Sequence, residues 1–223
     1  LRFESEISQK IGLTFERKNE VFNFSVNPFI HQISNFIVLE PTSIRQTIRG
    51  NFQVWEYRQT DAKLLGFDID ATYKFAKKFQ FNHQFSFVKG YDVSNNDEPL
   101  INMPPVNTKN EIVYQNKKIN NLRLGLQSEY VFQQNEYPDN NFEVYIPQTE
   151  TYEIVDISTP PGAYHLLNFN SSIDIKATKN SILTVGFNIT NVLNTSYRNY
   201  LNRMRYYADD LGRNFLLNLK LNY

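Results

Sequence analysis

The sequence of 223 residues is long enough for one large β domain, and its composition excludes several classes of function. Its 23 basic and 23 acidic residues give a formal net charge of zero, whereas a nucleic-acid surface needs a basic excess. The absence of cysteine excludes disulfides, thiolate metal sites and cysteine nucleophiles. No stretch approaches the roughly 18 apolar residues of a transmembrane helix, while the 15% of aromatic residues favours β-strands.

Apolar and polar residues alternate along most of the chain, as expected of strands whose two faces have different surroundings. In one example, Leu65, Phe67 and Ile69 alternate with Asp68 and Asp70. No long segment shows helical periodicity. The alternation predicts about nine strands, whose boundaries are accurate to a few residues. They are 5–17, 20–38, 51–75 (with a bend near Gln59-Thr60-Asp61), 79–91, 106–115, 120–134, 163–178, 181–196 and 211–223.

The connections between these strands alternate between short and long along the whole chain. The short ones are 18–19, 76–78, 116–119 and 179–180, and the long ones are 39–50, 92–105, 135–162 and 197–210. In an up-and-down meander, all short turns then lie at one end of the sheet and all long loops at the other. This asymmetry is typical of outer-membrane barrels, which have short periplasmic turns and long extracellular loops.

The sequence therefore predicts an all-β fold, an antiparallel up-and-down transmembrane β-barrel. The last strand runs toward the short turns, which places Tyr223 at the periplasmic end and Leu1 at the opposite end. Because nine open strands would leave two unpaired edges in lipid, we expect further strands upstream. The alternation also predicts lipid-facing side chains at Leu65, Phe67, Ile69, Tyr73, Leu183, Val185, Phe187, Leu217 and Leu219.

Several segments resemble motifs of the TonB-dependent receptor family, in the order that this family shows. The opening Leu1-Arg2-Phe3-Glu4, followed by Ile11-Gly12-Leu13, resembles a strand entry of the family, although Phe3 stands where the family usually has proline. The other matching segments are Asp61-Ala62-Lys63-Leu64-Leu65-Gly66-Phe67-Asp68, Pro99-Leu100-Ile101-Asn102-Met103-Pro104-Pro105-Val106, Phe187-Asn188-Ile189-Thr190-Asn191-Val192-Leu193-Asn194-Thr195-Ser196-Tyr197 and Leu211-Gly212-Arg213-Asn214-Phe215. The asparagine- and tyrosine-rich style resembles receptors of Bacteroidetes.

This resemblance implies that residues 1–223 are the C-terminal part of a barrel of about 22 strands in the bacterial outer membrane. It implies a receptor, not an enzyme, that imports a scarce nutrient such as an iron–siderophore, haem, cobalamin, copper or a glycan. This part would supply barrel wall and extracellular loops. The family's plug domain and TonB box would lie outside this sequence. The implied partners are outer-membrane lipid, the TonB complex through that missing region, and a small-molecule or metal-complex ligand.

The candidate ligand-binding residues lie in the long loops, where aromatic and arginine side chains gather. Tyr145 and Tyr152 lie too far from any strand for a membrane girdle and could stack on a ligand. Arg203, Arg205 and Tyr206 belong to the densest charged cluster, in which a planar guanidinium could bind an anionic ligand through two hydrogen bonds. The alternative that we favour for this cluster is an ion-pair network that folds its loop onto the rim.

Metal and catalytic chemistry have little support in the sequence. His31, His83 and His165 show no metal-ligand spacing, so we expect neither a metal nor a cofactor. His165 borders the longest loop and is the histidine best placed to meet a ligand. A barrel enzyme would need an acid, base and nucleophile at the loop end, where Asp156, Ser158 and His165 lack a supporting spacing. A soluble lipocalin-like barrel is the other alternative, because alternation alone does not tell which face lies inside.

The last strand has an apolar stripe that ends on an aromatic residue. Phe215, Leu217, Leu219, Leu221 and Tyr223 recur at period two and would face lipid, with Tyr223 at the periplasmic interface. Similar outer-membrane proteins use such a strand as the signal for the barrel-assembly machinery, which could add it edge to edge. We therefore expect these five residues to serve assembly, whereas the alternative role for Tyr223 is that of one more girdle residue.

Overall fold

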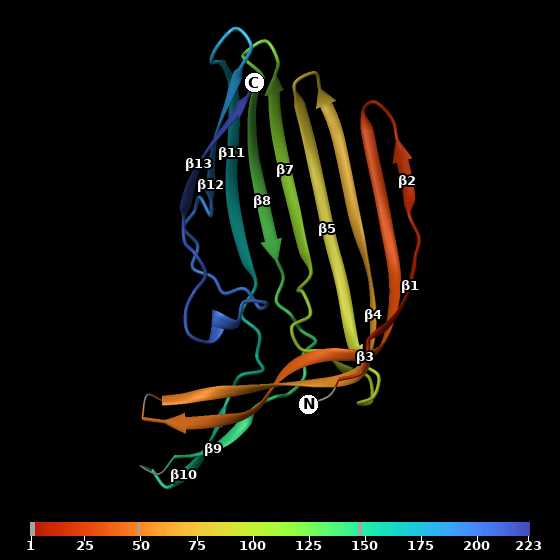
Figure 1. The fold of residues 1–223 in the computed structure, drawn as a ribbon, viewed down its shortest axis with the longest axis vertical. Helices are drawn as coiled ribbons and strands as arrows, with labels where there is room; N and C mark the ends of the chain where they lie inside the picture. Colours follow the sequence, from red (N-terminus) through yellow and green to blue (C-terminus); the bar gives the residue numbers. More distant parts are fainter. Residues whose placement is uncertain (1–2, 49, 147–148) are drawn as a thin grey trace.

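The computed structural model describes residues 3–48, 50–146 and 149–223, most of which form one antiparallel β-sheet (Figure 1). The strands of this sheet are β1 (Ile7–Gly12), β2 (Phe15–Lys18), β3 (Phe22–Thr47), β4 (Gly50–Ala76), β5 (Phe79–Asp92), β6 (Glu98–Pro99), β7 (Asn107–Asn116), β8 (Leu122–Val131), β11 (Tyr164–Lys176), β12 (Ile182–Thr190) and β13 (Asn214–Asn222). A separate hairpin consists of β9 (Phe142–Ile146) and β10 (Thr151–Val155), and η1 (Arg203–Tyr206) is a 3-10 helix. Within the described ranges, no helix is long and apolar enough to cross a membrane.

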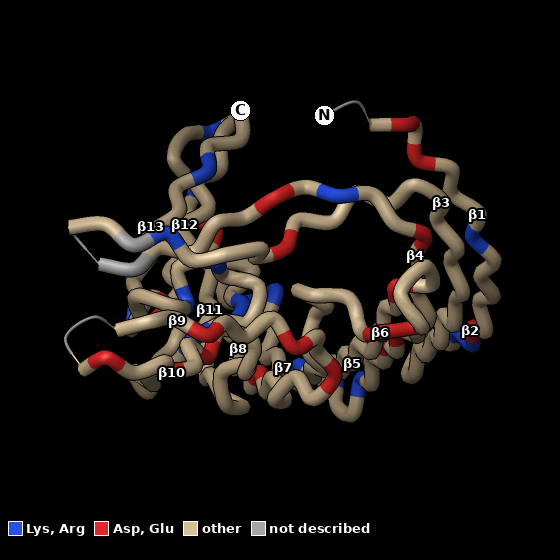
Figure 2. Tube along the Cα trace, turned by 90° about the horizontal axis from the view of Figure 1, so that it is seen from below, with Lys and Arg blue, Asp and Glu red and all other residues tan. Residues whose placement is uncertain are grey.

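The sheet curls into an arc that does not close on itself. Its main path is β1-β3-β4-β5-β7-β8-β11-β12-β13, and β2 pairs with β3 beside β1. Figure 2 shows β12 and β13 at one end of this arc and β1 and β2 at the other. This up-and-down order confirms the predicted antiparallel fold of about nine wall strands, with the interrupted β1 and β2 counted as one. It also confirms that the sheet is curved but open.

One face of the sheet is a continuous apolar surface. Phe67 in β4 lies opposite Phe87 in β5, and its ring centroid is 5.4 Å from that of Phe87 and 5.7 Å from that of Phe85. At the other end of the arc, Val185 in β12 lies opposite Leu219 in β13. The residues predicted to face lipid thus share one face, as the period of two requires.

The opposite face is polar and lies on the inside of the arc. Glu111 in β7 accepts hydrogen bonds of 2.9 Å from Asn82 in β5 and of 2.9 Å from Asn170 in β11. Because β8 lies between β7 and β11, the second bond spans two strand spacings, about 10 Å. Side chains that bridge this gap converge, as they do on a concave surface. An inner polar face and an outer apolar face are the reverse of a lipocalin, so that alternative is wrong.

Gly125 in β8 makes this crossing possible. A Cβ atom there would lie 2.5 Å from the amide of Asn170 and 2.7 Å from Oε1 of Glu111. We expect Gly125→Val to break the Asn170–Glu111 hydrogen bond and to lower the free energy of unfolding by about 1–3 kcal/mol. Denaturant unfolding of the purified receptor in detergent measures this change. Gly162→Val is the matched control, because a Cβ at Gly162 meets no atom within 4 Å; equal losses in both variants would contradict the prediction.

The two ends of the sheet differ as the connection lengths predict. In Figure 1 the tight turns lie at the end where the C-terminus is marked, and the long excursions lie at the end of the N-terminus. On the apolar face at the short-turn end, rings follow one another at 6.2 Å for Tyr73–Phe75, 5.8 Å for Phe75–Phe79 and 5.1 Å for Phe79–Tyr114. Such a row is typical of the aromatic girdle at a membrane interface.

The prediction of an unpaired loop over 39–50 is wrong. β3 continues to Thr47 and β4 begins at Gly50, so the segment pairs as a long hairpin that we call the arm (residues 38–58). The pairing shifts between Ile33, opposite Ala62, and Phe36, opposite Thr60. The sheet therefore bends near 59–61 as predicted, but the extra residue belongs to β3 and not to the strand predicted over 51–75.

Other strand boundaries also differ from prediction, for local reasons. The strand predicted over 181–196 ends at Thr190, because Asn191 has a φ of 51° and its side chain binds the backbone N–H and C=O of Thr195 at 2.8 Å each. Residues 135–162 contain the β9–β10 hairpin. Leu1 and Arg2 of the first motif, and Arg49, Pro147 and Gln148 of the predicted loops, lie outside the described residues.

Candidate functional site

Three long segments meet at the loop end of the arc, which we call the mouth. The arm leaves the wall and crosses over the concave side toward the end of the arc that carries β12 and β13 (Figure 2). The segment 98–106, which consists of β6 and its connection to β7, and the segment 197–210 between β12 and β13 also extend there. Residues from all three segments contact one another, although the wall strands from which they arise are far apart in the sheet. The mouth is therefore the place where a ligand would meet several segments at once.

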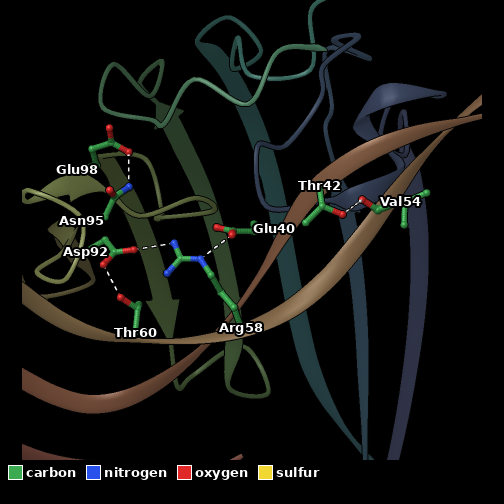
Figure 3. Close-up of polar contacts among 8 residues, drawn as sticks. All are labelled: Glu40, Thr42, Val54, Arg58, Thr60, Asp92, Asn95 and Glu98. Atoms are coloured by element: carbon green, nitrogen blue, oxygen red, sulfur yellow. Dashed lines mark hydrogen bonds and ion pairs between the residues drawn. The ribbon is translucent and has the colours of Figure 1, made fainter. Parts of the chain in front are cut away.

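The root of the arm is fixed by a partly buried charge cluster, in which Asp92 is the buried member (Figure 3). Arg58 donates from Nε to Glu40 at 2.5 Å and from Nη2 to Asp92 at 2.6 Å. Asp92, which is 2% exposed, also accepts a hydrogen bond from the hydroxyl of Thr60. The hydrogen bond to Glu40 raises the pKa of Arg58 above its ordinary value; burial opposes this rise and the bond to Asp92 adds to it. The guanidinium thus stays charged and ties both arm strands to β5.

A cavity of about 410 Å³ opens beside this cluster. Its charged lining consists of Glu40, Asp92, Glu98 and Asp139 together with the one guanidinium of Arg58. Its apolar lining comes from Val38, Pro99, Leu100, Ile101 and Pro138, and its neutral polar lining from Thr60, Ser94, Asn95 and Asn140. The carboxylates give the cavity an acidic character, although Arg58 already compensates two of them.

The arm root provides a test of this arrangement. We expect Asp92→Asn to weaken the bonds to Arg58 and Thr60 and to destabilise the closed arm by about 1–3 kcal/mol. Faster hydrogen exchange of the arm amides, with unchanged exchange in β8 and β11, would report the loss. Asp97→Asn is the matched control, because Asp97 is exposed and its carboxylate forms no ion pair with a described residue. Unchanged arm exchange in Asp92→Asn would contradict this role of the cluster.

The segment 197–210 folds through its own polar contacts. Arg198 donates to Asp209 at 2.7 Å and to the backbone carbonyl of Arg205 at 2.8 Å. The carboxylate of Asp210 accepts from the backbone of Asn199 at 2.7 Å and from the side chain of Asn202 at 2.8 Å. Of the ion-pair network favoured from the sequence, the described residues form one pair, Arg198–Asp209, and Asp210 is bound by neutral donors instead.

Arg205 is the centre of the contact between this segment and 98–106. Its guanidinium lies 4.2 Å from the ring centroid of Tyr200 and 4.7 Å from that of Tyr206, within cation–π range. It donates to Oδ1 of Asn102 at 3.2 Å and to the hydroxyl of Tyr206 at 2.6 Å. The side chain is only 5% exposed. Burial raises the pKa of both Tyr200 and Tyr206, so both phenols are neutral near pH 7.

Trp55 joins the arm to the same segment. Its ring centroid is 6.3 Å from that of Tyr206, and the guanidinium of Arg203 lies 5.9 Å from the Trp55 ring. The sequence analysis missed Trp55, Tyr200 and the Arg58 cluster as members of the site. The one available signal was that Trp55 is the only tryptophan in the sequence.

The structure does not bring the other candidate residues into this cluster. Tyr145 and Tyr152 pair with a centroid distance of 5.2 Å on the β9–β10 hairpin, which projects beyond the wall (Figure 1). His165 lies on the apolar face of β11, where its Nε2 is 2.8 Å from the hydroxyl of Ser128 and its ring is 6.4 Å from that of Tyr130. Among the described residues, no group of three or more His, Cys, Asp or Glu could hold a metal ion.

The set considered for a barrel enzyme is not assembled either. Asp156 accepts hydrogen bonds from the backbone N–H groups of Ser158 at 3.1 Å and Thr159 at 3.0 Å, and these contacts hold a turn. Hydrogen bonds from Thr159, from the side chain first, lower the pKa of Asp156. The hydroxyl of Ser158 accepts from the backbone of Asn140 at 2.5 Å. Neither residue contacts His165, so these groups do not form a nucleophile with a base.

Comparisons with known proteins agree with this architecture. Residues 3–192 match the model of a family described as TonB dependent receptor-like, beta-barrel. Among solved structures, the copper transporter OprC is similar at a TM-score of 0.70 and 15% identity, over 99% of this chain and 31% of that one. The FrpB iron transporter from Neisseria meningitidis (F3-3 variant) is similar at 0.64 and 15%, over 99% and 31%.

A third similar structure is the ferripyoverdine receptor of the outer membrane of Pseudomonas aeruginosa, at a TM-score of 0.57 and 16% identity, over 95% of this chain and 26% of that one. No curated protein matches the sequence. The chain spans about a third of the length of the solved structures that it matches. At these identities the structural matches show the fold, which is a curved section of a larger barrel wall.

Proposed function

Because the chain belongs to the TonB-dependent receptor-like β-barrel family, whose members lie in the bacterial outer membrane, we propose that it is part of a receptor that imports a scarce nutrient. In this proposal β1 to β13 supply wall and extracellular loops. The observation that carries it is the combination of an apolar outer face with a polar inner face beneath a mouth of converging loops. Such a wall can enclose a polar path through lipid.

Ligand capture in this proposal takes place at the mouth. Arg203, Arg205 and Tyr206 form the receiving surface together with Trp55. The paired rings of Tyr145 and Tyr152 offer a stacking surface farther out, whereas His165 lies on the lipid-facing side, where a role at the interface fits better. Energy for transport would come from the TonB complex through a region outside these residues. An iron–siderophore, haem, cobalamin, copper complex or glycan would each fit a receptor of this kind.

Assembly is the second part of the proposal. Phe215, Leu217, Leu219 and Leu221 share the apolar face with Phe187, whose ring stacks on that of Phe215 at 6.3 Å. Among the described residues, β13 pairs only with β12, so its other edge is open to a further strand. This stripe, with Tyr223, would be recognised by the barrel-assembly machinery. Outer-membrane lipid would then cover the same stripe in the inserted receptor.

Transport is tested with the intact receptor in its native membrane. The receptor gene is deleted, and growth is measured when iron, copper, cobalamin or a glycan is supplied as the single limiting nutrient. Import predicts that one nutrient fails to support the deletion strain and that the wild-type gene restores growth. Equal growth of both strains on every limiting nutrient, together with equal uptake of each labelled nutrient, would contradict the proposal. Detergent-free solubility of the receptor would contradict its membrane location.

A further inference from the structure

Every short turn of the sheet carries lysine. The short turns contain no aspartate or glutamate, and their lysines are Lys18, Lys77, Lys78, Lys117, Lys118 and Lys179. The long loops 92–105 and 135–162 have the opposite composition, with several acidic residues and neither lysine nor arginine. The net charge of zero therefore hides a separation of charge along the strands, in which the end opposite the mouth is basic.

Two of the lysine-bearing turns lie side by side at this end (Figure 1). β5 pairs with β7, and the backbone N–H of Gln115 donates to the carbonyl of Lys78 at 2.8 Å. The β4–β5 turn, with Lys77 and Lys78, therefore adjoins the β7–β8 turn, with Lys117 and Lys118. Two pairs of ammonium groups thus lie at one edge of the sheet.

A cavity of about 390 Å³ opens between these turns. We call it the lysine pocket, because its lining includes Lys74, Lys77, Lys78, Lys117 and Lys118. Among the described residues, no aspartate or glutamate lines it, and none of these five lysines forms an ion pair. The pocket therefore concentrates positive charge that the described part of the chain does not balance.

The carboxylates of the neighbouring strands have other partners. Glu111 on β7 accepts hydrogen bonds of 2.9 Å from Asn82 and from Asn170. It also lies 3.5 Å from the guanidinium of Arg123. The carboxylate of Asp174 on β11 accepts from two neutral side chains at 2.7 Å each. A counter-charge for the lysine pocket would therefore have to come from outside these strands.

A buried asparagine fixes one wall of the pocket at the level of the aromatic girdle. Asn116 is 5% exposed, and its amide donates to the hydroxyl of Tyr114 at 2.9 Å. Its Oδ1 accepts from the backbone N–H of Lys118 at 3.1 Å, which holds the turn. Phe79, whose ring packs on that of Tyr114, also lines the pocket. Because aromatic girdles mark membrane interfaces, the pocket lies at the depth of lipid headgroups.

A phosphate group suits the chemistry of this lining. Each lysine ammonium carries three donors and binds phosphate as a point charge. The long aliphatic stems of lysine pack along apolar surface, here Val113 and Phe79, while the charged ends turn toward one anion. The amides of Gln80 and Gln115 add neutral donors to the same lining. A cation would meet only positive charge there.

We propose that the lysine pocket binds a phosphate group at the short-turn end of the receptor wall. The site lies at the end of the sheet opposite the mouth, so the proposal goes beyond nutrient import and does not depend on which nutrient is carried. Phosphate can come from the headgroup of a membrane phospholipid or from a soluble anion. The position beside the girdle favours the headgroup, and the two sources give different results in the test.

The test offers both sources of phosphate to the intact receptor purified in detergent. The receptor is incubated with equimolar phosphatidylglycerol and phosphatidylcholine, and the retained lipid is measured by native mass spectrometry. We expect at least about a tenfold excess of the anionic lipid, as two or more lysines beside an anionic headgroup would produce. In a parallel arm, inorganic pyrophosphate that binds and displaces the lipid would assign the site to a soluble anion. Equal retention of both lipids, without pyrophosphate binding, would overturn the proposal.

Substitutions assign the binding to the pocket itself. Lys78→Gln combined with Lys118→Gln removes one charge from each turn and should weaken binding of the preferred probe about tenfold. Lys18→Gln combined with Lys179→Gln is the matched control, because it removes two charges at the same end of the sheet but outside the pocket lining. All four side chains are exposed, so both double variants should keep the fold. Equal losses in the two variants, or wild-type binding after loss of Lys78 and Lys118, would overturn the proposal.

Discussion

An arginine in place of Phe67 is expected to destabilise the inserted receptor by about 2–4 kcal/mol, the range for a charged residue near the membrane midplane on the lipid face. Phe67 lies in the central part of β4, packed against the rings of Phe85 and Phe87 on the apolar face. The substitution both removes this packing and places a guanidinium against lipid, where it finds no water. Val185→Arg in β12 should behave in the same way, because Val185 shares this face.

Gln84→Arg provides the matched control on the opposite face. Gln84 lies on β5, next to β4, and its amide donates to Asp70 at 3.0 Å on the polar side of the sheet. An arginine there keeps a carboxylate partner and an aqueous surrounding, so we expect little loss. The free energy of unfolding is measured for each variant by denaturant titration in lipid vesicles. Equal losses for Phe67→Arg and Gln84→Arg would show that the two faces have been assigned the wrong way round.

The wall of the barrel could be predicted from the sequence because its two solvents differ so strongly. Lipid on one side and a polar lumen on the other impose a period of two on every strand, as in Leu65, Phe67 and Ile69 against Asp68 and Asp70. Alternation does not reveal which face is inside. The hydrogen bond between Glu111 and Asn170 identifies the polar face as the inner one, because this bond crosses β8 and requires a concave surface.

The arm could not be predicted from the same signal. Over residues 39–48 the chain leaves the wall, so neither face of the hairpin meets lipid and no regular alternation is needed. Pro41 also predicts the end of a strand, because proline lacks the N–H that a central strand needs. In the structure Pro41 nevertheless lies opposite Trp55, next to a second register shift in β3. Backbone pairing with β4 therefore sets the structure of this segment, and that pairing becomes visible only in three dimensions.

The candidate site was predictable only where its residues are neighbours in sequence. Arg203, Arg205 and Tyr206 lie within four positions, so their density was apparent in the sequence. The residues that they contact are distant in sequence: Asn102, which accepts from Arg205, is 103 residues away, and Trp55, which packs near Tyr206, lies in the arm. Because these partners are distant in sequence, the sequence alone could not tell which arginines of the cluster pair internally and which contact other segments. Arg198 forms an ion pair within the segment, whereas Arg205 donates to Asn102 on segment 98–106 and Arg203 lies 5.9 Å from the ring of Trp55 in the arm.

Removal of Tyr223 is expected to reduce the amount of receptor in the outer membrane severalfold without changing the affinity of the inserted fraction for its ligand. The physical reason lies in β13, where Phe215, Leu217, Leu219 and Leu221 form one stripe on the apolar face and Tyr223 continues it. A strand with one open edge can pair with the assembly machinery, so that backbone bonds give affinity and alternate side chains give selectivity. The aromatic ring at the end would sit in the apolar interface with its hydroxyl in water.

The measurement separates assembly from ligand binding. Outer-membrane fractions of the intact receptor with and without Tyr223 are compared by immunoblot, and the ligand affinity of each inserted population is determined by titration. Tyr114→Ala is the control, because Tyr114 is a girdle residue at the same end of the sheet but in a central strand. If Tyr223 were only another girdle residue, both variants would lose abundance equally. Normal abundance without Tyr223, or a loss of affinity at normal abundance, would refute the assembly role. Tyr223 lies at the short-turn end of the sheet, opposite the mouth, so it should not contact the ligand (Figure 1).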